Sequence, residues 1–448
     1  MSAAEGEERP GEFSPGYTRY ALGLLLVVYI FNFIDRQIVA ILLQSIKEDL
    51  DLSDTQLGFF SGTAFAIFYS TLGIPIARWS DRNSRTKLIA LALMVWSAMT
   101  ALQGFARTFT VLALARVGVG VGEAGCSPPA HSMLADFFPV SKRATALAIY
   151  ALGIPIGSAI GYATGGWVAE NVGWREAFIV VGLPGILLAG VVRLTLREPT
   201  RGYWDSAESR AAAMAVRSEP LADVARFLLA RRAFLHLAFA GALHAFIGYG
   251  AGAFNPSFYE RLHGFSRAEL GYVLAAVALT AGVAGTFAGG WVTDRLSRRD
   301  VRWYAWFPAL TTLLSVPFLF LFYLAPGRWE AVGWSLLPTL LGSTYLGPTF
   351  ALTQTMVPAR WRSQASALLL LVLNLIGLGL GPQFIGLVSD LLAPDYGLES
   401  VRYALVATTA VGATWSTVHY MLAAGSLRKD LEAQDELDGV APGGEDKP

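Results

Sequence analysis

The sequence has few of the residues from which most enzyme sites and disulfide frameworks are built. It contains one cysteine, Cys126, and five histidines among 448 residues. A single cysteine excludes an internal disulfide and a cysteine-rich metal site. The chain also lacks a His-Glu-x-x-His pair, a Gly-x-Ser-x-Gly elbow and a P-loop, so no familiar enzyme motif is present. We therefore expect a protein that is not an enzyme and holds no metal.

Charged residues are scarce as well. They make up 15% of the chain, whereas a soluble domain usually carries about 25%. The 34 lysines and arginines balance the 34 acidic residues, so no overall field would attract nucleic acid. Because hydrophobic residues make up 54% of the chain, the composition is typical of a protein that crosses the membrane many times.

The apolar residues fall into twelve segments separated by short charged or Pro/Gly breaks. We expect helices at about 17–43, 55–78, 86–106, 108–137, 143–170, 173–196, 231–259, 267–293, 301–325, 329–356, 362–391 and 399–426. The fourth and tenth segments contain prolines, which neighbouring helices of a bundle can tolerate. Residues 1–16 lack a cleavable signal pattern, so we expect the first segment to remain as a span.

The distribution of positive charge predicts the orientation. With the N-terminus inside, most of the 34 lysines and arginines lie in the inner loops and flanks, as the positive-inside rule requires. We expect a multi-pass protein of the bacterial inner membrane, surrounded by membrane lipids, with both termini cytoplasmic.

An internal repeat divides the chain into two halves. Residues 53–59 match 266–272, and residues 81–85 match 294–298, at the same offset of 213 residues. Ordered matches at one offset indicate two parallel six-helix units. The predicted organisation is a cytoplasmic tail (1–16), an N-terminal bundle (17–196), a cytoplasmic linker (197–230), a C-terminal bundle (231–426) and a second cytoplasmic tail (427–448).

The loops after the second helix of each half resemble the signature of the major facilitator superfamily, Gly-x-x-x-Asp-Arg-x-Gly-Arg-Arg/Lys. Residues 77–86 read Ala-Arg-Trp-Ser-Asp-Arg-Asn-Ser-Arg-Thr, and residues 290–299 read Gly-Trp-Val-Thr-Asp-Arg-Leu-Ser-Arg-Arg. The resemblance implies an all-α membrane fold of two six-helix bundles and a transporter that works by alternating access. We expect the protein to be a monomer. Residues at these helix ends are expected to form ion pairs that close the inner side: Asp81, Arg82, Arg85, Asp294, Arg295 and Arg298.

Four charged residues lie within predicted membrane helices. Asp35 and Arg36 are adjacent in the first helix, and Arg116 and Glu123 lie seven residues apart in the fourth, on one helix face. We expect the intervening glycines to let another helix approach closely, which would bring Asp35 or Arg36 of the first helix within pairing range. Our hypothesis is that Asp35 or Glu123 takes up a proton and thereby frees an arginine for a substrate phosphate or carboxylate. Alternatively, the four charges form a static network that locks the helices together.

The C-terminal half does not repeat this charged pair, because the positions equivalent to Asp35 and Arg36 are Gly248 and Tyr249. We expect this half to supply shape and neutral contacts. The candidate substrate contacts are Asn255, Phe254, Asn374 and Gln354, with hydrogen bonding between helices as the alternative for the polar ones. Residues 120–125 also match Gly-x-Gly-x-x-Gly, but no strand precedes them, so no nucleotide cofactor is expected.

Two stretches resemble the spinster-like branch of this superfamily: Asn-Phe-Ile-Asp-Arg at 32–36, and the Gly-x-Gly-Glu-Ala run at 120–124 that follows Arg116. The resemblance implies an anionic, lipid-like substrate such as a lysolipid, moved with protons. It places Asp35, Arg36, Arg116 and Glu123 at the coupling and head-group positions.

Two alternatives remain open at this stage. One is transport of a small organic anion, which requires a mainly polar cavity; an apolar lining from Phe31, Phe33, Phe254, Phe258 and Phe384 would favour a lipid. The other is a membrane enzyme or receptor, although the chain has no catalytic motif and its longest loop is too short for a sensing domain.

Overall fold

The computed structural model describes residues 12–80, 82–204, 221–358 and 361–437, without the side chains of residues 77 and 432–437. Within these ranges the chain forms helices and no strand. The first half contains α1 (Pro15–Leu50), α2 (Asp54–Gly58), the π-helical turn η1 (Phe59–Thr63), α3 (Ala64–Ser80), α4 (Arg85–Gln103), α5 (Phe109–Glu123), α6 (Ser127–Phe137), α7 (Val140–Ala151), α8 (Gly153–Asn171) and α9 (Trp174–Thr195).

The second half begins with a short helix that precedes its first long one. It contains α11 (Leu221–Leu229), α12 (Arg232–His263), α13 (Arg267–Val277), the π-helical turn η2 (Ala278–Gly282), α14 (Val283–Ser297), α15 (Trp303–Tyr323), α16 (Arg328–Gly342), α17 (Leu346–Thr355), α18 (Arg362–Val372), the π-helical turn η4 (Leu373–Leu380), α19 (Gly381–Tyr396), the 3₁₀ turn η5 (Gly397–Glu399) and α20 (Ser400–Leu437).

These helices correspond to the twelve predicted segments. Ten helical stretches of the described chain are long and apolar enough to cross a membrane, and the last of them, Arg362–Leu431, runs from α18 through α19 into most of α20. The tenth predicted segment is divided into α16 and α17 near Ser343. In the fourth segment, Pro128 and Pro129 begin α6, where the first-turn N–H groups have no helical partner to lose.

The internal repeat marks two equivalent helix starts. Ser53 accepts a hydrogen bond from the Gln56 backbone, whose side chain accepts one from the Ser53 backbone. Ser266 and Glu269 form the same reciprocal capping box at the start of α13. The matched sequences are therefore the N-terminal caps of the second helix in each half.

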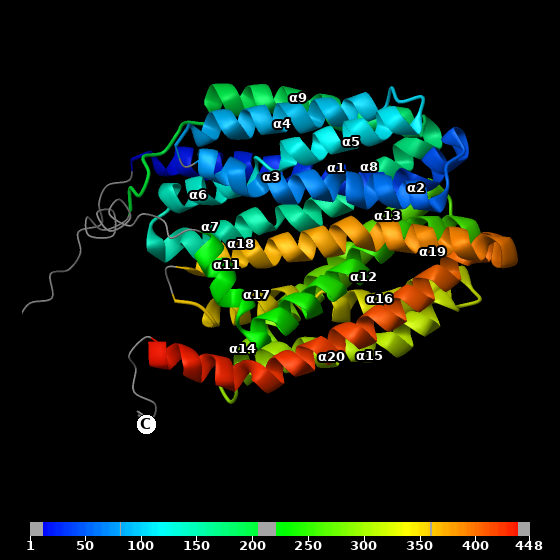
Figure 1. Ribbon diagram of the computed structural model, residues 1–448. Helices are drawn as coiled ribbons and strands as arrows, with labels where there is room; N and C mark the ends of the chain where they lie inside the picture. The colour runs from blue at the N-terminus through cyan, green and yellow to red at the C-terminus, as the bar shows by residue number, and fades with distance from the viewer. Residues whose placement is uncertain (1–11, 81, 205–220, 359–360, 438–448) are drawn as a thin grey trace, which may run out of the picture.

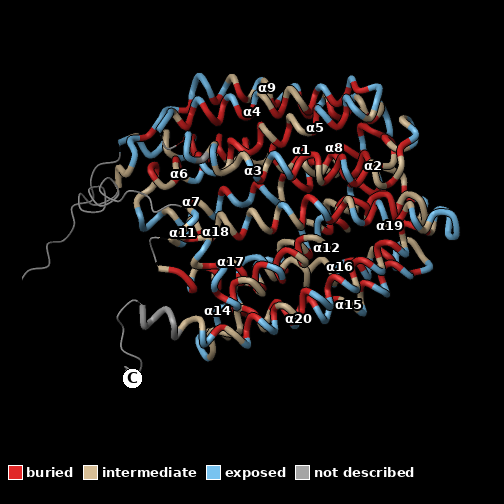
Figure 2. Tube along the Cα trace, in the orientation of Figure 1, coloured by how far each residue is buried: buried red, intermediate tan, exposed pale blue. Residues whose placement is uncertain are grey.

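The two halves lie side by side as parallel bundles (Figure 1). In the first, α1 packs on α8 and α4 packs on α9; in the second, α12 and α15 pack on α20. Buried residues concentrate where helices face one another, whereas the outer faces are exposed (Figure 2). We call the end at which α1 begins and α20 ends the terminal end, and the other end the opposite end.

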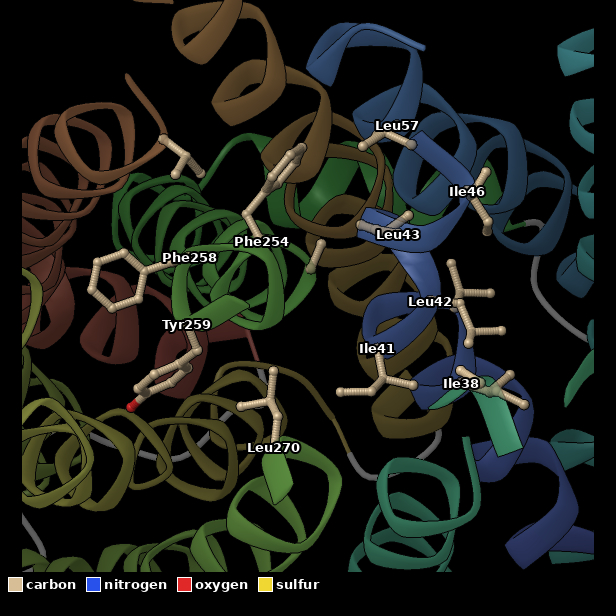
Figure 3. Close-up of a cluster of buried hydrophobic side chains, with 14 of the residues drawn as sticks. Ile38, Ile41, Leu42, Leu43, Ile46, Leu57, Phe254, Phe258, Tyr259 and Leu270 are labelled. Atoms are coloured by element: carbon tan, nitrogen blue, oxygen red, sulfur yellow. The ribbon is translucent and has the colours of Figure 1, made fainter. Parts of the chain in front are cut away.

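At the opposite end the two halves share one hydrophobic core. Figure 3 shows Ile41 and Leu43 of α1 in the same cluster as Phe254 and Phe258 of α12. Glycine lets the backbones meet there, since a Cβ on Gly386 would lie 2.1 Å from the carbonyl oxygen of Asp54. The structure is therefore closed at the opposite end.

Ion pairs also hold the two halves together at this end. Arg261 of α12 binds Asp54 of α2 at 2.7 Å, and Arg267 of α13 contacts Glu48 of α1 at 3.1 Å. Both pairs lie at the opposite end. Between described residues, no ion pair joins the halves at the terminal end.

Candidate functional site

The charged residues of the first half meet in the interior of its bundle, between α1 and α5. Glycines of α5 permit close packing of helices. We expected them to face α1, but their closest contacts are with α3 and α4. A Cβ on Gly120 would lie 2.6 Å from the carbonyl oxygen of Phe65, and one on Gly122 would lie 2.7 Å from the backbone nitrogen of Trp96. The position of α5 is thus fixed on the side away from α1.

Arg36 and Glu123 form the central ion pair. The Arg36 Nε donates to Glu123 Oε2 at 2.8 Å, and the Glu123 side chain is fully buried. The Arg36 guanidinium also lies 4.6 Å from the ring centroid of Tyr69 and 5.1 Å from that of Phe65. The other carboxylate oxygen of Glu123 has no hydrogen-bond partner among the described residues, so half of this carboxylate is left unsatisfied.

Asp35 lies behind Arg36 and is 1% exposed. Thr100 of α4 donates its hydroxyl to Asp35 Oδ2 at 2.5 Å. The second oxygen, Oδ1, is buried with no hydrogen-bond partner in the described chain. A carboxylate held by one hydroxyl in an apolar interior is poorly compensated as an anion.

Arg116 is the unpaired member of the group. It is 2% exposed, and its Nε and Nη1 have no hydrogen-bond partner within the described residues. Its guanidinium lies 4.6 Å from the ring centroid of Phe65, and its charge interacts through space with Asp35 and Glu123. A buried cation without a bonded counter-ion is costly to maintain, so this group is suited to receive an anion.

A cavity of about 480 Å³ lies between the two halves and reaches both arginines. Its wall in the first half includes Phe33, Arg36, Gln37, Phe65 and Arg116, whereas Asp35 and Glu123 do not line it. The two acids therefore lie behind the two cations. A ligand in the cavity would meet positive charge and reach the acids only through the arginines.

The wall in the second half is neutral and rich in hydroxyl groups. The side chains with hydroxyl groups that line it are Tyr249, Thr312, Ser315, Tyr323, Ser335, Thr339, Ser343 and Tyr345. Sequence reasoning missed most of them. The four-residue spacing of Ser335, Thr339 and Ser343 could have revealed them, because it places all three on one helix face. Tyr249 occupies the position in the second half that is equivalent to Arg36 in the first. Both residues line the cavity, each from its own half.

His244 is held rigidly in this wall. Its Nε2 lies 2.9 Å from the carbonyl oxygen of Gly342, and its Nδ1 lies 3.0 Å from the Thr312 hydroxyl. Because a carbonyl only accepts, Nε2 carries a proton and donates it to Gly342, while the Thr312 hydroxyl lies within hydrogen-bond distance of Nδ1. The Tyr345 ring stacks on the imidazole at 3.9 Å between centroids.

The residues predicted for the second half are divided between the cavity and the protein interior. Asn255 lines the cavity, and its side-chain oxygen accepts a hydrogen bond from Tyr323 at 3.0 Å. Phe254 is fully buried in the core, and Gln354 donates to Ser366 at 3.1 Å. Neither Gln354 nor Asn374 lines the cavity in the described chain, so contact of these three with substrate stays a prediction.

The aromatic lining also differs from the one predicted. Of the five phenylalanines expected to line the cavity, Phe33 alone does so among the described residues. Phe254 and Phe258 pack in the core that joins the halves at the opposite end. Phe65 and Phe322 supply aromatic surface to the cavity in their place.

The predicted gating residues lie at the terminal end, where they do not pair across the halves. Arg85 is fully buried and binds Asp136 of α6 and Glu198 of the segment after α9, neither of which belongs to the second half. The remaining four described residues of the set are exposed: Arg82, Asp294, Arg295 and Arg298. Asp81 lies outside the described residues. A gating role for these residues would require the other conformation and stays a prediction.

Comparison with known proteins agrees with this architecture. Residues 25–382 match the model of the Major Facilitator Superfamily. An MFS-type efflux pump of Mycolicibacterium smegmatis is 34% identical over 413 residues, which cover 92% of this chain and 94% of the pump. Protein spinster homolog 1 of Homo sapiens is 28% identical over 91% of this chain and 81% of its own length.

A solved structure extends the match to three dimensions. The crystal structure of a bacterial homolog of the human lysosomal transporter spinster, in an inward-facing and unoccupied conformation, superimposes with a TM-score of 0.85. It is 32% identical, and the alignment covers 93% of this chain and 99% of that one. The chain belongs to the major facilitator superfamily of transporters, in its spinster-like branch.

Proposed function

We propose that the protein moves an anionic, lipid-like substrate, such as a lysolipid, across the membrane by proton-coupled alternating access. The observation that carries the proposal is the Arg116 guanidinium, which is buried, has no partner for Nε and Nη1 within the described chain, and forms part of the cavity wall. Arginine binds phosphate and carboxylate groups through two parallel hydrogen bonds. An anionic head group in the cavity would supply the missing counter-ion.

Proton coupling would act through the acids behind the cations. Glu123 holds Arg36 through one oxygen and leaves the other unpartnered within the described chain. A proton on Glu123 removes the negative charge that holds Arg36, so the Arg36 guanidinium becomes available to the substrate. Asp35 offers a second buried carboxylate with one unsatisfied oxygen.

The direction of opening is inferred from charge. Because the positive-inside rule places the terminal end in the cytoplasm, a structure closed at the opposite end faces inward. The similar bacterial spinster homolog was also solved in an inward-facing state. In the proposed cycle the cavity is next exposed at the opposite end, when the pairs there separate and the terminal end closes.

A small organic anion is the second candidate substrate. The observation that favours it is the hydroxyl-rich second wall, together with Asn255 and the fixed His244. These groups would hold a hydrophilic molecule as well as a lipid head group. A lipid additionally requires space for an acyl chain, for which the apolar residues Leu319, Phe322 and Leu274 are available in the lining.

The test is flux of a labelled lysophospholipid into proteoliposomes. The wild type is expected to transport it, and Arg116→Gln to raise the KM about 10- to 100-fold, because a hydrogen bond to a charged group contributes about 1.5–3 kcal/mol. Arg116→Lys keeps the charge without the planar fork and should fall between the two. Absence of lysolipid flux in folded protein that does transport organic carboxylates or phosphate esters would establish the second candidate.

A further inference from the structure

A second group of charged residues lies at the opposite end, where the two halves meet. A cavity of about 380 Å³ there is lined by Gln44, Glu48, Glu170, Glu260, Arg261, Phe265, Ser266 and Arg267. It shares no lining residue with the central cavity, and the transport mechanism proposed above assigns no role to its Glu260.

Glu260 is the unusual member of this group. Its side chain is 9% exposed, and its Oε1 is buried with no hydrogen-bond partner among the described residues. Its other oxygen lies 3.5 Å from Arg267 Nε. A carboxylate buried with one long contact to a cation is a poor anion, because transfer from water removes hydrogen bonds that nothing replaces.

Arg267 cannot serve Glu260 alone. Its Nη2 donates to Glu48 Oε2 of the first half at 3.1 Å, so one guanidinium is divided between two carboxylates. The next cation, Arg261, is fully engaged: it donates to both carboxylate oxygens of Asp54 at 2.7 Å and to the side chain of Gln44 at 2.7 Å.

The third carboxylate adds further negative charge. Glu170 of α8 accepts the backbone N–H of Ala268 at 2.7 Å. The charged groups that face Glu260 are thus Glu48 from α1, Glu170 from α8, Arg267 from α13 and the engaged Arg261 on its own helix. Arg267 is thus divided between Glu48, whose side chain is 57% exposed, and Glu260, whose side chain is 9% exposed. Glu260 is therefore the carboxylate that lacks an adequate counter-charge when the halves close.

We propose that Glu260 is a second proton-binding site, which takes up a proton when the halves close over it and releases it to water when they separate. The proton is the cation that fits, because the described carboxylates form no group able to hold a metal ion. A neutral Glu260 leaves Arg267 free to bind Glu48 across the interface. The site rests on the alternating access proposed above but not on the identity of the substrate.

The experiment measures closure of the opposite end as a function of pH. Spin labels are attached at Arg107→Cys, before α5, and Leu398→Cys, in η5; both positions are exposed. The background is Cys126→Ala, which removes the one native cysteine. Distance distributions in lipid nanodiscs then give the ratio of closed to open molecules between pH 5 and pH 8.

One proton bound on closure makes this ratio rise by up to about tenfold for each unit of falling pH. Other acids, including Asp35 and Glu123, also make this ratio depend on pH. The informative quantity is therefore the difference in slope between variants. Glu260→Gln, a neutral mimic of the protonated acid, is expected to favour the closed form. Its ratio of closed to open molecules should depend less steeply on pH, because one titrating group has been removed. Glu260→Ala should show the same reduction in slope. Glu330→Gln, at an exposed acid of the same end, should retain the wild-type slope.

The outcomes separate this site from the transport mechanism. Equal slopes in the wild type and in both Glu260 variants would overturn the assignment of Glu260 while leaving alternating access intact. A distance that responds neither to pH nor to substrate would contradict alternating access and the Glu260 site together.

Discussion

Two buried arginines of the first half illustrate opposite uses of the same side chain. Arg85 donates to Glu198 at 2.7 Å and to the carbonyl oxygen of Pro199 at 2.8 Å, and it also binds Asp136. Its hydrogen-bond donors thus have partners within the described chain, and these bonds connect α4 to α6 and to the segment after α9. Arg116 is also buried and faces the cavity, but its Nε and Nη1 have no hydrogen-bond partner among the described residues. The satisfied arginine stabilises the fold, and the unsatisfied one is available to a ligand.

The cluster around Arg85 predicts a pH-dependent contribution to stability. Burial raises the pKa of Glu198, but hydrogen bonds from the Thr86 backbone, the Arg85 guanidinium and the Ser84 hydroxyl outweigh it and hold the pKa below its ordinary value. A lowered pKa stabilises the fold above the unfolded-state value of about 4.3, and this stabilisation is lost as the pH falls through the folded-state value.

Glu198→Gln should therefore lower the free energy of unfolding at pH 7 by on the order of 1 kcal/mol. It should also flatten the loss of stability in acid, because the titrating group is gone. Thermal unfolding in detergent from pH 7 to pH 3.5 measures both effects, with Glu330→Gln as the control at an exposed acid. Acid curves that run parallel in the wild type and Glu198→Gln would contradict this account.

At the scale of elements, the seam between α8 and α13 depends on direct backbone contact. A Cβ on Gly271 would lie 2.4 Å from the carbonyl oxygen of Tyr162, and one on Gly166 would lie 2.3 Å from that of Arg267. Such distances leave no room for any side chain. The two helices belong to different halves, so these glycines determine how tightly the opposite end can close.

Gly271→Ala should consequently separate α8 from α13 and shift the protein toward the form that is open at the opposite end. Overpacking of this kind typically destabilises by about 1–3 kcal/mol. Gly282→Ala is the matched control, because a Cβ there meets nothing within 4 Å. The distance between labels at Arg107→Cys and Leu398→Cys should lengthen in the first variant alone; equal distances in both variants would refute the role assigned to the seam.

The sequence predicted the helices well, because apolar runs and capping residues are local signals. The match between residues 53–59 and 266–272 proved to be a pair of capping boxes. The partner of each buried charge was not predictable, since it depends on how helices rotate against one another. The structure was therefore needed to show that Arg36 binds Glu123, whereas Nε and Nη1 of Arg116 have no partner in the described part of the chain.

The expected pairing of Arg85 across the halves shows a second limit of sequence reasoning. A motif identifies a charged residue at a helix end, but the conformation decides what that residue meets. In this conformation the halves meet at the opposite end, where Asp54, a residue of the repeated segment 53–59, binds Arg261, which lies in no recognised motif. Arg261 and Asp54 are more than 200 residues apart in sequence, so folding of the whole chain is what brings them together.

At the scale of the whole molecule, several polar contacts that close the opposite end converge on Asp54. Arg261 donates to it from α12 and Ser389 donates from α19 at 2.6 Å, so two helices of the second half bind one carboxylate of the first. Asp390 in turn accepts the backbone N–H groups of Asp54 and Thr55, at the start of α2. Opening at this end must break all of these bonds.

Arg261→Gln should shift the protein strongly toward the open form. Removing one partner of a buried ion pair destabilises the state that contains the pair by about 3–5 kcal/mol. If only part of this energy distinguishes the closed from the open form, the ratio of closed to open molecules falls roughly a hundredfold. Arg328→Gln is the control, because Arg328 pairs with Glu269 within the second half at the same end. The same labelled distances report the result, and an unchanged distribution in Arg261→Gln would count against this ion pair as the closing contact.

The central claim is that the buried acids behind Arg36 and Arg116 couple proton movement to transport of an anion. The most direct test is flux of labelled lysolipid in proteoliposomes under an imposed pH gradient, for the wild type, Asp35→Asn and Glu123→Gln. The account predicts gradient-driven accumulation in the wild type and its loss in both variants, which should still exchange substrate without a gradient. Gradient-driven accumulation unchanged in both variants would contradict the claim and reduce the buried charges to a structural network.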